Sequence, residues 1–406
     1  MSPIKKYCAK NPAAVSAAGA ALVALLAVGQ VANAAQDSRP PPLPIEPTDV
    51  VESLPRDYPP NWFLVHDVGF FHMSDGKVYI LDSAAETSSR AIKGMFNVSY
   101  MGNLAQSARR GEIYATEAFH PRGTRGDRID VLTIWDTATL TPKGEVMLRP
   151  GKRLFGMPER YAVVTLDNDR FLAIANFSPA TSATIIDLDT REIVAEIPTP
   201  GCSLVYPTGK LGFSSLCADG RFMSTELNTD GTLLKQTRTD SFFSSDDNPI
   251  YERPAVIDGI AYFPSIAGLV YPVDVRGKVA EVGEAWSLVS EQEREQNWAP
   301  GGIVLIDRDD QGRFYVIMHA DAKDGSYQGG GSEVWVFDAV KKQRVMRIAL
   351  REWGLSLGLS RGKNPVLMVV NPMTMSLEMY NTESGEFISS IDDFGQETPL
   401  MMTGSK

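Results

Sequence analysis

The chain has 406 residues, of which 50 are acidic and 39 are basic, so its formal net charge is −11 at pH 7. This acidity gives the chain no electrostatic reason to bind nucleic acid or an anionic membrane. Only four histidines occur and none belongs to a His-Glu-x-x-His or His-x-His motif, so a histidine-based metal centre is not expected.

Residues 1–34 predict a cleaved signal peptide. Three lysines precede an Ala/Leu/Val-rich run, and the small residues of Ala32-Asn33-Ala34 then form a cleavage site. We expect cleavage after Ala34 rather than an uncleaved anchor, because the run is only weakly apolar. The mature chain would then be exported without inserting into the membrane.

Residues 35–61 have a different composition from the rest of the chain, with eight prolines between Pro40 and Pro60. Proline removes backbone hydrogen-bond donors and favours extended polyproline conformation. The segment is therefore predicted to be an N-terminal arm outside the core. Two alternatives remain open for it, disorder and docking on a partner.

From Trp62 onward one pattern recurs, in which a short apolar strand ends in an acidic or amide turn residue. Strands that are apolar on both faces precede these endings, as expected when sheets stack face to face. Repeats of this length with several strands each are typical of propeller blades. We predict an all-β fold for residues 62–406, a seven-bladed β-propeller of four-stranded antiparallel blades. The seven endings are Asp82, Asp136, Asp187, Asn228, Asp274, Asp338 and Asn381.

Two further features have structural consequences. The tail TPLMMTG at residues 398–404 is predicted to supply a strand that closes the first or the last blade. The segment 287–296 is the best candidate for an amphipathic helix, in a connection between strands.

Cys202 and Cys217 are the two cysteines that remain after the signal peptide is removed. They flank a segment with a Pro207-Thr208-Gly209 turn at its middle, which predicts a hairpin. In an exported protein such a pair is expected to form a disulfide. The alternative is two free buried thiols.

Recognisable catalytic motifs are lacking. The sequence contains no G-x-S-x-G nucleophile motif and no G-K-[ST] phosphate loop. His66 and His72 lack a third nearby ligand and are read as surface or packed histidines. The stretch 307–312 resembles the start of a calcium loop, but an acidic hairpin turn is the preferred interpretation, because Met318 stands where a bidentate glutamate is needed. These observations favour a scaffold or a partner subunit.

Several segments give the chain a resemblance to the large (heavy) subunit of periplasmic quinoprotein amine dehydrogenases, and to the aromatic-amine (aralkylamine) type more than to the methylamine type. The cysteine pair belongs to the matching regions, and the W-SL-x8-NW-x-PGG and SPATS patterns are the most specific. The matching segments are residues 71–82, 124–136, 176–187, 246–256, 285–302, 315–327 and 333–348.

The resemblance implies a seven-bladed propeller in an α2β2 assembly with a small (light) subunit. It implies that tryptophan tryptophylquinone is built from two tryptophans of that small subunit, and that an azurin- or amicyanin-like copper protein accepts the electrons. The implied reaction is oxidative deamination of primary amines to aldehyde and ammonia. On this chain it implies no catalytic, cofactor-binding or metal-binding residue, so its six tryptophans are interpreted as packing and interface residues.

One site residue follows from the resemblance. The family has a phenylalanine, in a loop after the first repeat, at the mouth of the substrate channel. Gly94–Asn97 occupies that place here, which makes Phe96 the candidate gate of the channel, with a plain packing role as the alternative. For the whole chain, the alternative to a dehydrogenase subunit is a partnerless periplasmic β-propeller that acts as a binding module.

Overall fold

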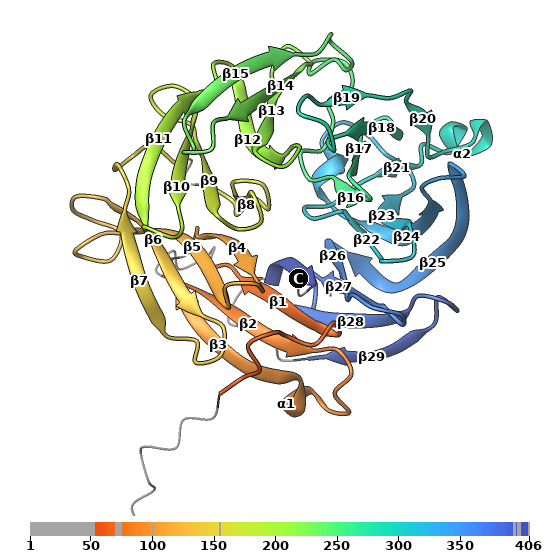
Figure 1. Cartoon of the computed structure of the whole chain (residues 1–406). Helices are drawn as coiled ribbons and strands as arrows, with labels where there is room; N and C mark the ends of the chain where they lie inside the picture. Colours follow the sequence, from red (N-terminus) through yellow and green to blue (C-terminus); the bar gives the residue numbers. More distant parts are fainter. Residues whose placement is uncertain are drawn as a thin grey trace, which may run out of the picture. The chain divides into compact units, whose positions relative to one another are not determined.

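The computed structural model describes residues 53–69, 75–99, 101–153, 156–392, 395 and 399–404. The predicted signal peptide, its cleavage site after Ala34, and the arm up to residue 52 lie outside the described residues. The described residues form one compact unit, in which seven antiparallel sheets are arranged as a ring (Figure 1). The prediction of an all-β, seven-bladed propeller is confirmed.

Each blade is one sheet, and its strands follow one another from the axis outward. Blade 1 consists of β30 (Pro399–Gly404), β1 (Trp62–Asp67), β2 (Gly76–Asp82) and β3 (Ile92–Val98), and blade 2 of β4 (Asn103–Ser107), β5 (Glu112–Phe119), β6 (Ile129–Asp136) and β7 (Pro142–Met147). Blade 3 consists of β8 (Val163–Leu166), β9 (Phe171–Asn176), β10 (Ser182–Asp187) and β11 (Glu192–Pro198). Blade 4 consists of β12 (Cys202–Pro207), β13 (Gly212–Cys217), β14 (Phe222–Leu227) and β15 (Leu233–Arg238). Blade 5 consists of β16 (Ala255–Ile257), β17 (Ile260–Pro264), β18 (Leu269–Asp274), and β19 (Glu281–Val282) with β20 (Trp286–Ser287). Blade 6 consists of β21 (Ala299–Pro300) with β22 (Ile306–Arg308), β23 (Arg313–His319), β24 (Gly331–Asp338) and β25 (Gln343–Gly354). Blade 7 consists of β26 (Ser356–Leu359), β27 (Val366–Asn371), β28 (Ser376–Asn381) and β29 (Phe387–Ile391).

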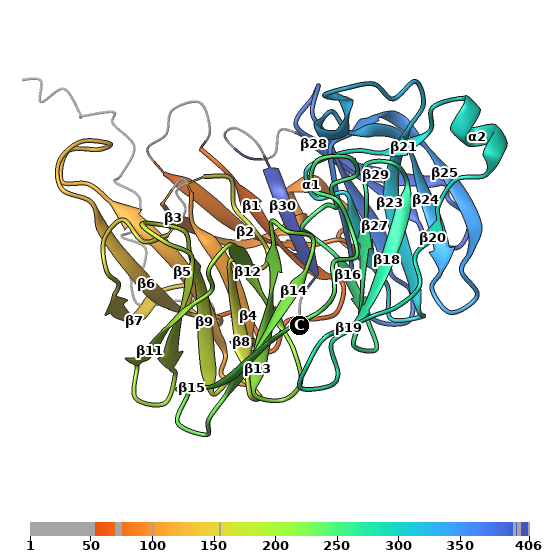
Figure 2. The ribbon, with the colours of Figure 1, turned by 90° about the horizontal axis from the view of Figure 1, so that it is seen from above.

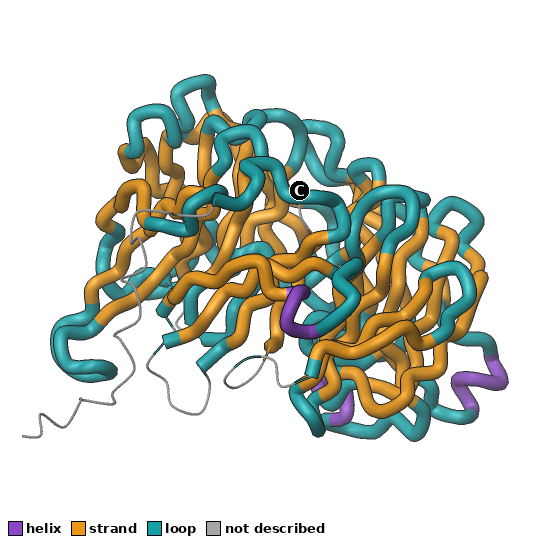
Figure 3. The backbone as a smooth tube through the Cα atoms, turned by 90° about the horizontal axis from the view of Figure 1, so that it is seen from below, coloured by secondary structure: helices purple, strands orange, loops and turns teal. Residues whose placement is uncertain are grey.

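Two blades have one position filled by two short strands. β19 and β20 both pair with β18 and together form the outer strand of blade 5. β21 and β22 both pair with β23 and form the inner strand of blade 6. Three short helical segments, α1 (Ser88–Ala91), α2 (Glu291–Glu295) and η1 (Ser326–Gln328), lie in connections at the edge of the strand framework (Figure 3). Among the described residues, no helix has the length and apolar character needed to cross a lipid bilayer.

Burial falls from the second strand of each blade to the outermost one. Seven of the eight residues of β5 are buried, whereas β15 contains no buried residue. The second and third strands are covered on both faces by the neighbouring blades, and the edge-on view shows the sheets standing side by side (Figure 2). Their continuous apolar sequences follow from this two-sided burial.

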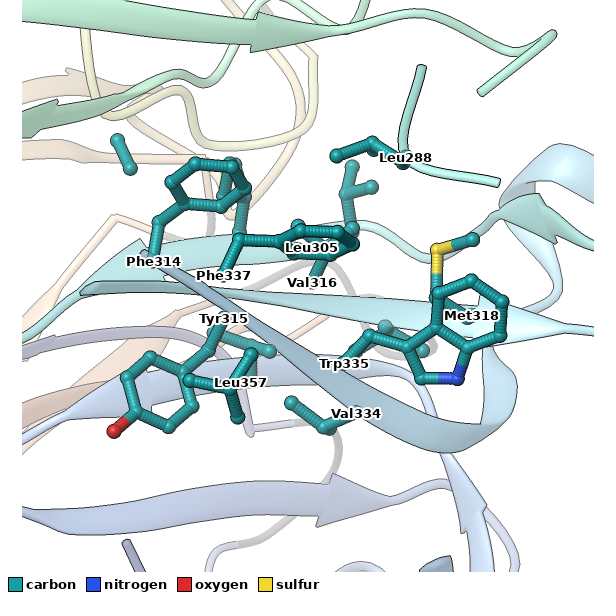
Figure 4. Close-up of a cluster of buried hydrophobic side chains, with 14 of the residues drawn as sticks. Leu288, Leu305, Phe314, Tyr315, Val316, Met318, Val334, Trp335, Phe337 and Leu357 are labelled. Atoms are coloured by element: carbon teal, nitrogen blue, oxygen red, sulfur yellow. The ribbon is translucent and has the colours of Figure 1, made fainter. Parts of the chain in front are cut away.

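The largest apolar cluster joins blades 5, 6 and 7. The Phe314 and Phe337 rings stack with their centroids 5.3 Å apart, and Tyr262 of blade 5 stacks on Phe314 at the same centroid distance. Figure 4 shows these two phenylalanines beside Leu305 and Val316, with Trp335 further along the same sheet. Because the contacts cross from blade to blade, no single blade could bury these side chains alone.

The recurring acidic or amide residues act as turn formers, as predicted. In six of the seven endings a side-chain oxygen accepts a hydrogen bond from a backbone N–H two residues later. In blade 4 the role passes from Asn228 to Asp230, whose carboxylate accepts the N–H of Thr232 at 3.0 Å.

The C-terminal strand closes the ring. β30 pairs antiparallel with β1 in blade 1, with Phe63 opposite Gly404 and Val65 opposite Met402. This confirms the prediction that the tail completes a terminal blade. Strands from the two ends of the described chain therefore share one sheet.

The described end of the predicted arm packs on its own propeller. The Leu54 N–H donates to the Ala138 carbonyl at 2.8 Å, and the Tyr58 hydroxyl donates to the Thr137 carbonyl at 2.7 Å. The Pro60 carbonyl accepts the Arg361 N–H of blade 7 at 2.7 Å. Residues 53–61 therefore belong to the surface of the propeller, which differs from the expected boundary at Trp62.

Candidate interaction face and channel

The two ends of the ring carry different connections. One side, which we call the connection face, carries the connections from the second to the third strand of each blade and the connections from each blade to the next. On the other, the turn face, lie the hairpins between first and second strands and between third and fourth strands. The longer segments of the chain and its two main cavities can be placed relative to these faces.

A buried charged network lies at the connection face of blade 2. Asp130 is fully buried and accepts hydrogen bonds from Arg128 at 2.6 Å and from Arg153 at 3.0 Å, and the Gly151 N–H donates to its second oxygen at 2.7 Å. Burial lowers the pKa of Arg153, although Asp130 counteracts this effect. Glu117 lies nearby and accepts the Ser99 N–H at 2.8 Å, and burial raises the pKa of its carboxyl group.

A second ion pair lies near the centre of the connection face and connects two segments of the chain. Glu159, in the segment before blade 3, pairs with Arg253, in the segment before blade 5. Arg253 also donates to the Ile303 carbonyl at 2.8 Å, and the Glu159 N–H donates to the Asn103 side chain at 2.6 Å. Burial raises the pKa of Glu159 to about 7, although the adjacent Arg253 favours the charged form.

A cavity of about 240 Å³ lies beside this ion pair. Its lining includes the acidic residues Glu159 and Glu252, the basic residue Arg153, and the amide residues Asn103 and Asn176. Glu159 is already paired with Arg253 and Arg153 is cationic, so the lining combines acidic, basic and amide groups that can both donate and accept hydrogen bonds.

Exposed apolar side chains lie next to the network of blade 2. Phe119 and Ile129 are opposite each other at the ends of β5 and β6, and Met147 is opposite Val131 on the adjacent β7. All three are more than two-fifths exposed. We call Phe119, Ile129 and Met147 the blade 2 patch. A contiguous exposed apolar patch is typical of a surface that binds another protein.

A second, larger cavity of about 610 Å³ lies along the axis of the ring. Inner strands of several blades line it, together with the segment around Pro60. Its charged residues gather around Asp307, which is buried and paired with Arg361 at 3.3 Å and with Arg160 at 3.5 Å. Burial would raise the pKa of Asp307, but these two guanidinium groups lower it on balance. His66 also lines this cavity.

The family follows from comparison with known proteins. A family model described as methylamine dehydrogenase heavy chain (MADH) matches residues 61–405, which is nearly the whole propeller. The chain belongs to the methylamine dehydrogenase heavy chain family. The heavy chain of Methylophilus methylotrophus is 26% identical over 347 residues, covering 84% of this chain and 83% of that protein. The heavy chain of Paracoccus versutus is 24% identical over 343 residues, covering 80% and 79%.

Solved structures agree on the fold alone. A functionally unknown protein from Desulfotomaculum acetoxidans superimposes with a TM-score of 0.56 at 13% identity, covering 85% of this chain and all of that chain. A putative 6-phosphogluconolactonase from Bacteroides fragilis gives a TM-score of 0.55, also at 13% identity, covering 88% and 98%. At this identity the likeness carries no information on activity.

Phe96, the candidate gate of a heavy chain of this family, does not lie in a loop. Gly94–Asn97 is part of β3, where Phe96 pairs with Val78 of β2, so the loop placement is wrong. The Phe96 side chain is 5% exposed, and its ring centroid is 4.6 Å from that of Trp135. This burial favours the packing interpretation, and the gate role stays a prediction. Met95 and Asn97 are exposed whereas Phe96 and Val98 are buried, which is the alternation of a strand with one face covered.

The disulfide and the most specific motif of the heavy-chain resemblance are both explained by the fold. Cys202 and Cys217 face each other in β12 and β13 and form a disulfide, as predicted.

In the PGG sequence, a Cβ on Gly301 would lie 2.7 Å from the His319 ring, and Gly302 has a φ of +133°. Only glycine fits these two positions.

The remaining sequence-based candidates have structural roles. Asp309 forms the acidic hairpin turn between β22 and β23, and its carboxylate accepts the N–H groups of Gln311 and Arg313. His66 is a buried strand residue, whereas His72 lies outside the described residues. Within the described ranges, no group of three histidine, cysteine or acidic side chains is arranged to hold a metal ion.

Sequence reasoning missed the Glu159–Arg253 pair and the arginines around Asp307. Glu159 and Arg253 are 94 positions apart in the chain. Asp307 is about 50 positions from Arg361 and about 150 from Arg160, and none of these residues belongs to a motif. Only the closed ring brings them together.

Proposed function

We propose that this chain is the large, cofactor-free subunit of a tryptophan tryptophylquinone amine dehydrogenase in the periplasm. The enzyme would oxidatively deaminate primary amines, with aromatic or aralkyl amines as the proposed substrates, to aldehyde and ammonia. A light subunit would complete an α2β2 assembly, and a small azurin- or amicyanin-like copper protein would accept the electrons. The observation that carries the proposal is the family match across residues 61–405.

The tryptophans of this chain fit a packing role better than a cofactor role. Trp298 and Trp335 are in ring contact, with centroids 5.1 Å apart. Trp335 is fully buried, its indole N–H donates to Glu333 at 2.6 Å, and Arg344 and Arg347 lie over its ring. An amine could not reach the Trp335 ring without unpacking the blade. The quinone, which would accept the electrons of the amine, is therefore proposed to lie on the light subunit.

Two features of the connection face support a role in such an assembly. The blade 2 patch presents apolar side chains that a partner subunit could cover. The cavity on the same face is lined by the acidic and amide side chains of Glu159, Glu252, Asn103 and Asn176, which an incoming amine could contact as hydrogen-bond acceptors. In this proposal the chain supplies a docking surface and the approach to the site, while the chemistry takes place on its partner.

The proposal is tested by expressing this chain together with a short, cysteine-rich protein that has two suitable tryptophans and is encoded by a neighbouring gene, and by purifying through a tag on this chain. We expect co-purification, visible quinone absorbance, and amine-dependent reduction of an artificial electron acceptor. Phenylethylamine would be turned over with a higher kcat/KM than methylamine if the aromatic preference holds. A chain that purifies alone and colourless beside the expressed small subunit would contradict the proposal and favour a partnerless binding module.

The docking surface is tested by Met147→Glu, with Ile388→Glu on the outer strand β29 as the matched control. Both side chains are at least half exposed, so neither change should unfold the chain. A charge within a buried apolar contact should weaken the association about tenfold or more, whereas the control should leave it unchanged. Equal affinity of both variants for the small subunit, measured by calorimetry, would exclude the blade 2 patch as the contact.

A further inference from the structure

The axial cavity contains a polar side chain whose burial needs an explanation. His66 in β1 is 1% exposed, and neither of its ring nitrogens has a hydrogen-bond partner among the described residues. Burial lowers its pKa to about 4, so at neutral pH the ring is uncharged, with one donor and one acceptor. Leaving both unpaired inside a protein is costly, and a ligand in the adjoining cavity would pair with one of them, since Nε2 lies close to Gly76 of β2.

The opposite part of the cavity carries a surplus of positive charge. The lining includes the guanidinium groups of Arg160, Arg308 and Arg361 but only two carboxylates, those of Asp307 and Asp310. In a chain with a net charge of −11 this local excess runs against the overall balance. A guanidinium is the group best suited to hold a carboxylate, through paired hydrogen bonds.

The register of blade 1 gives the spacing between these two polar regions. Gly404 and the Arg361 side chain are close together, because a Cβ atom added to Gly404 would lie 3.2 Å from that side chain. Gly404 is opposite Phe63 in the sheet, so Arg361 lies at the level of Phe63. His66 follows Phe63 by three residues, which corresponds to roughly 10 Å along a strand. Between the two levels the wall is mainly apolar, with Leu64, Leu104 and Val163 among its residues.

We propose that the axial cavity binds an elongated amphipathic organic anion. Its carboxylate would lie against Arg361 and Arg160, its apolar body between the inner strands, and a hydroxyl or N–H group at its far end would pair with His66. The cavity volume of about 610 Å³ is within the range of ordinary small-molecule sites. This site is separate from the cavity at Glu159, and it does not depend on the redox partner.

The proposal is tested by calorimetric titration of the purified full chain with 3-(4-hydroxyphenyl)propionate and 4-hydroxyphenylacetate, which carry a phenol and a carboxylate at opposite ends. Two analogues, 3-phenylpropionate and 4-hydroxyphenylethanol, each lack one of these groups. We expect saturable binding of at least one of the first pair, and binding about tenfold or more weaker for both analogues. Absence of binding by both hydroxyphenyl acids, or equal affinity for the analogues, would overturn the proposal.

Variants at two buried histidines locate the site. His66→Leu removes the hydrogen-bonding group from the cavity, and His319→Leu removes a ring that is also buried and unpaired at Nδ1 but does not line the cavity. We expect His66→Leu to raise the melting temperature of the ligand-free chain, to weaken binding about tenfold, and to eliminate the preference for the phenol over 3-phenylpropionate. His66→Gln should retain part of that preference. Unchanged binding by His66→Leu, or an equal loss in His319→Leu, would place the anion elsewhere.

Discussion

At the scale of single residues, the described structure separates side chains that stabilise the fold from those that face a cavity or solvent. Phe96 and Asp130 are enclosed by their neighbours, whereas Met147 is exposed. His66 and Glu159 form a third group, because each is largely enclosed yet has a polar atom without a partner among the described residues. Residues of this third group are where function is most reasonably sought.

Phe96→Ala should destabilise the chain by about 3–4 kcal/mol, because it leaves a cavity between β3 and Trp135. Chemical denaturation of the purified chain measures this loss. The gate prediction adds a kinetic expectation, namely that KM changes differently for small and bulky amines in the assembled enzyme. Equal KM values in variant and wild type across several amines would leave Phe96 with a packing role alone.

Glu159 should make stability depend on pH. Its carboxyl releases its proton near pH 4.5 when the chain is unfolded and near pH 7 when it is folded, since burial raises its pKa. Between these values the folded state binds more protons, so the free energy of unfolding falls as pH rises, by roughly 3 kcal/mol in total.

In Glu159→Gln this contribution is absent. The stability difference between wild type and variant, measured by denaturation at pH 4.5, 6 and 8, should therefore shift against the wild type as pH rises. A difference that stays constant over this range would show that Glu159 ionises normally in the folded chain.

At the scale of elements, the sequence predicted strands better than helices. The apolar runs were recognisable because both faces of the inner strands are buried. The helix expected over 287–296 is only α2, because Trp286–Ser287 pairs with β18 as a strand and Asn297 leaves the helical region with a φ of +53°. The Ser290 and Glu293 capping box fixes where this short helix begins.

The disulfide stabilises the first hairpin of blade 4. It closes a loop of 15 residues, so the Cys202→Ser/Cys217→Ser variant should be less stable by about 3 kcal/mol. Denaturation of the variant beside the oxidised and the reduced wild type measures this loss. The reduced wild type should match the variant, and equal stability of all three would show that the bond contributes nothing to the free energy of unfolding.

At the scale of the whole molecule, the number of blades could be predicted because each repeat carries its own turn residue. The cavities could not be predicted, because their walls come from inner strands of different blades. Asp307, Arg160 and Arg361 illustrate this limit, since nothing in their local sequences indicates that the three side chains meet. The resemblance named Phe96, but only the strand register showed where its ring points.

The pairing of β30 with β1 affects the order in which the molecule can be assembled. β1, β2 and β3 are made first, but their sheet is not completed until residues 399–404 are available. Among the described strands, blade 1 is thus begun first and finished last, and the ring stays open until residues 399–404 have been made. For a chain that we propose to be exported, the ring can therefore close only after residues 399–404 have left the secretion channel.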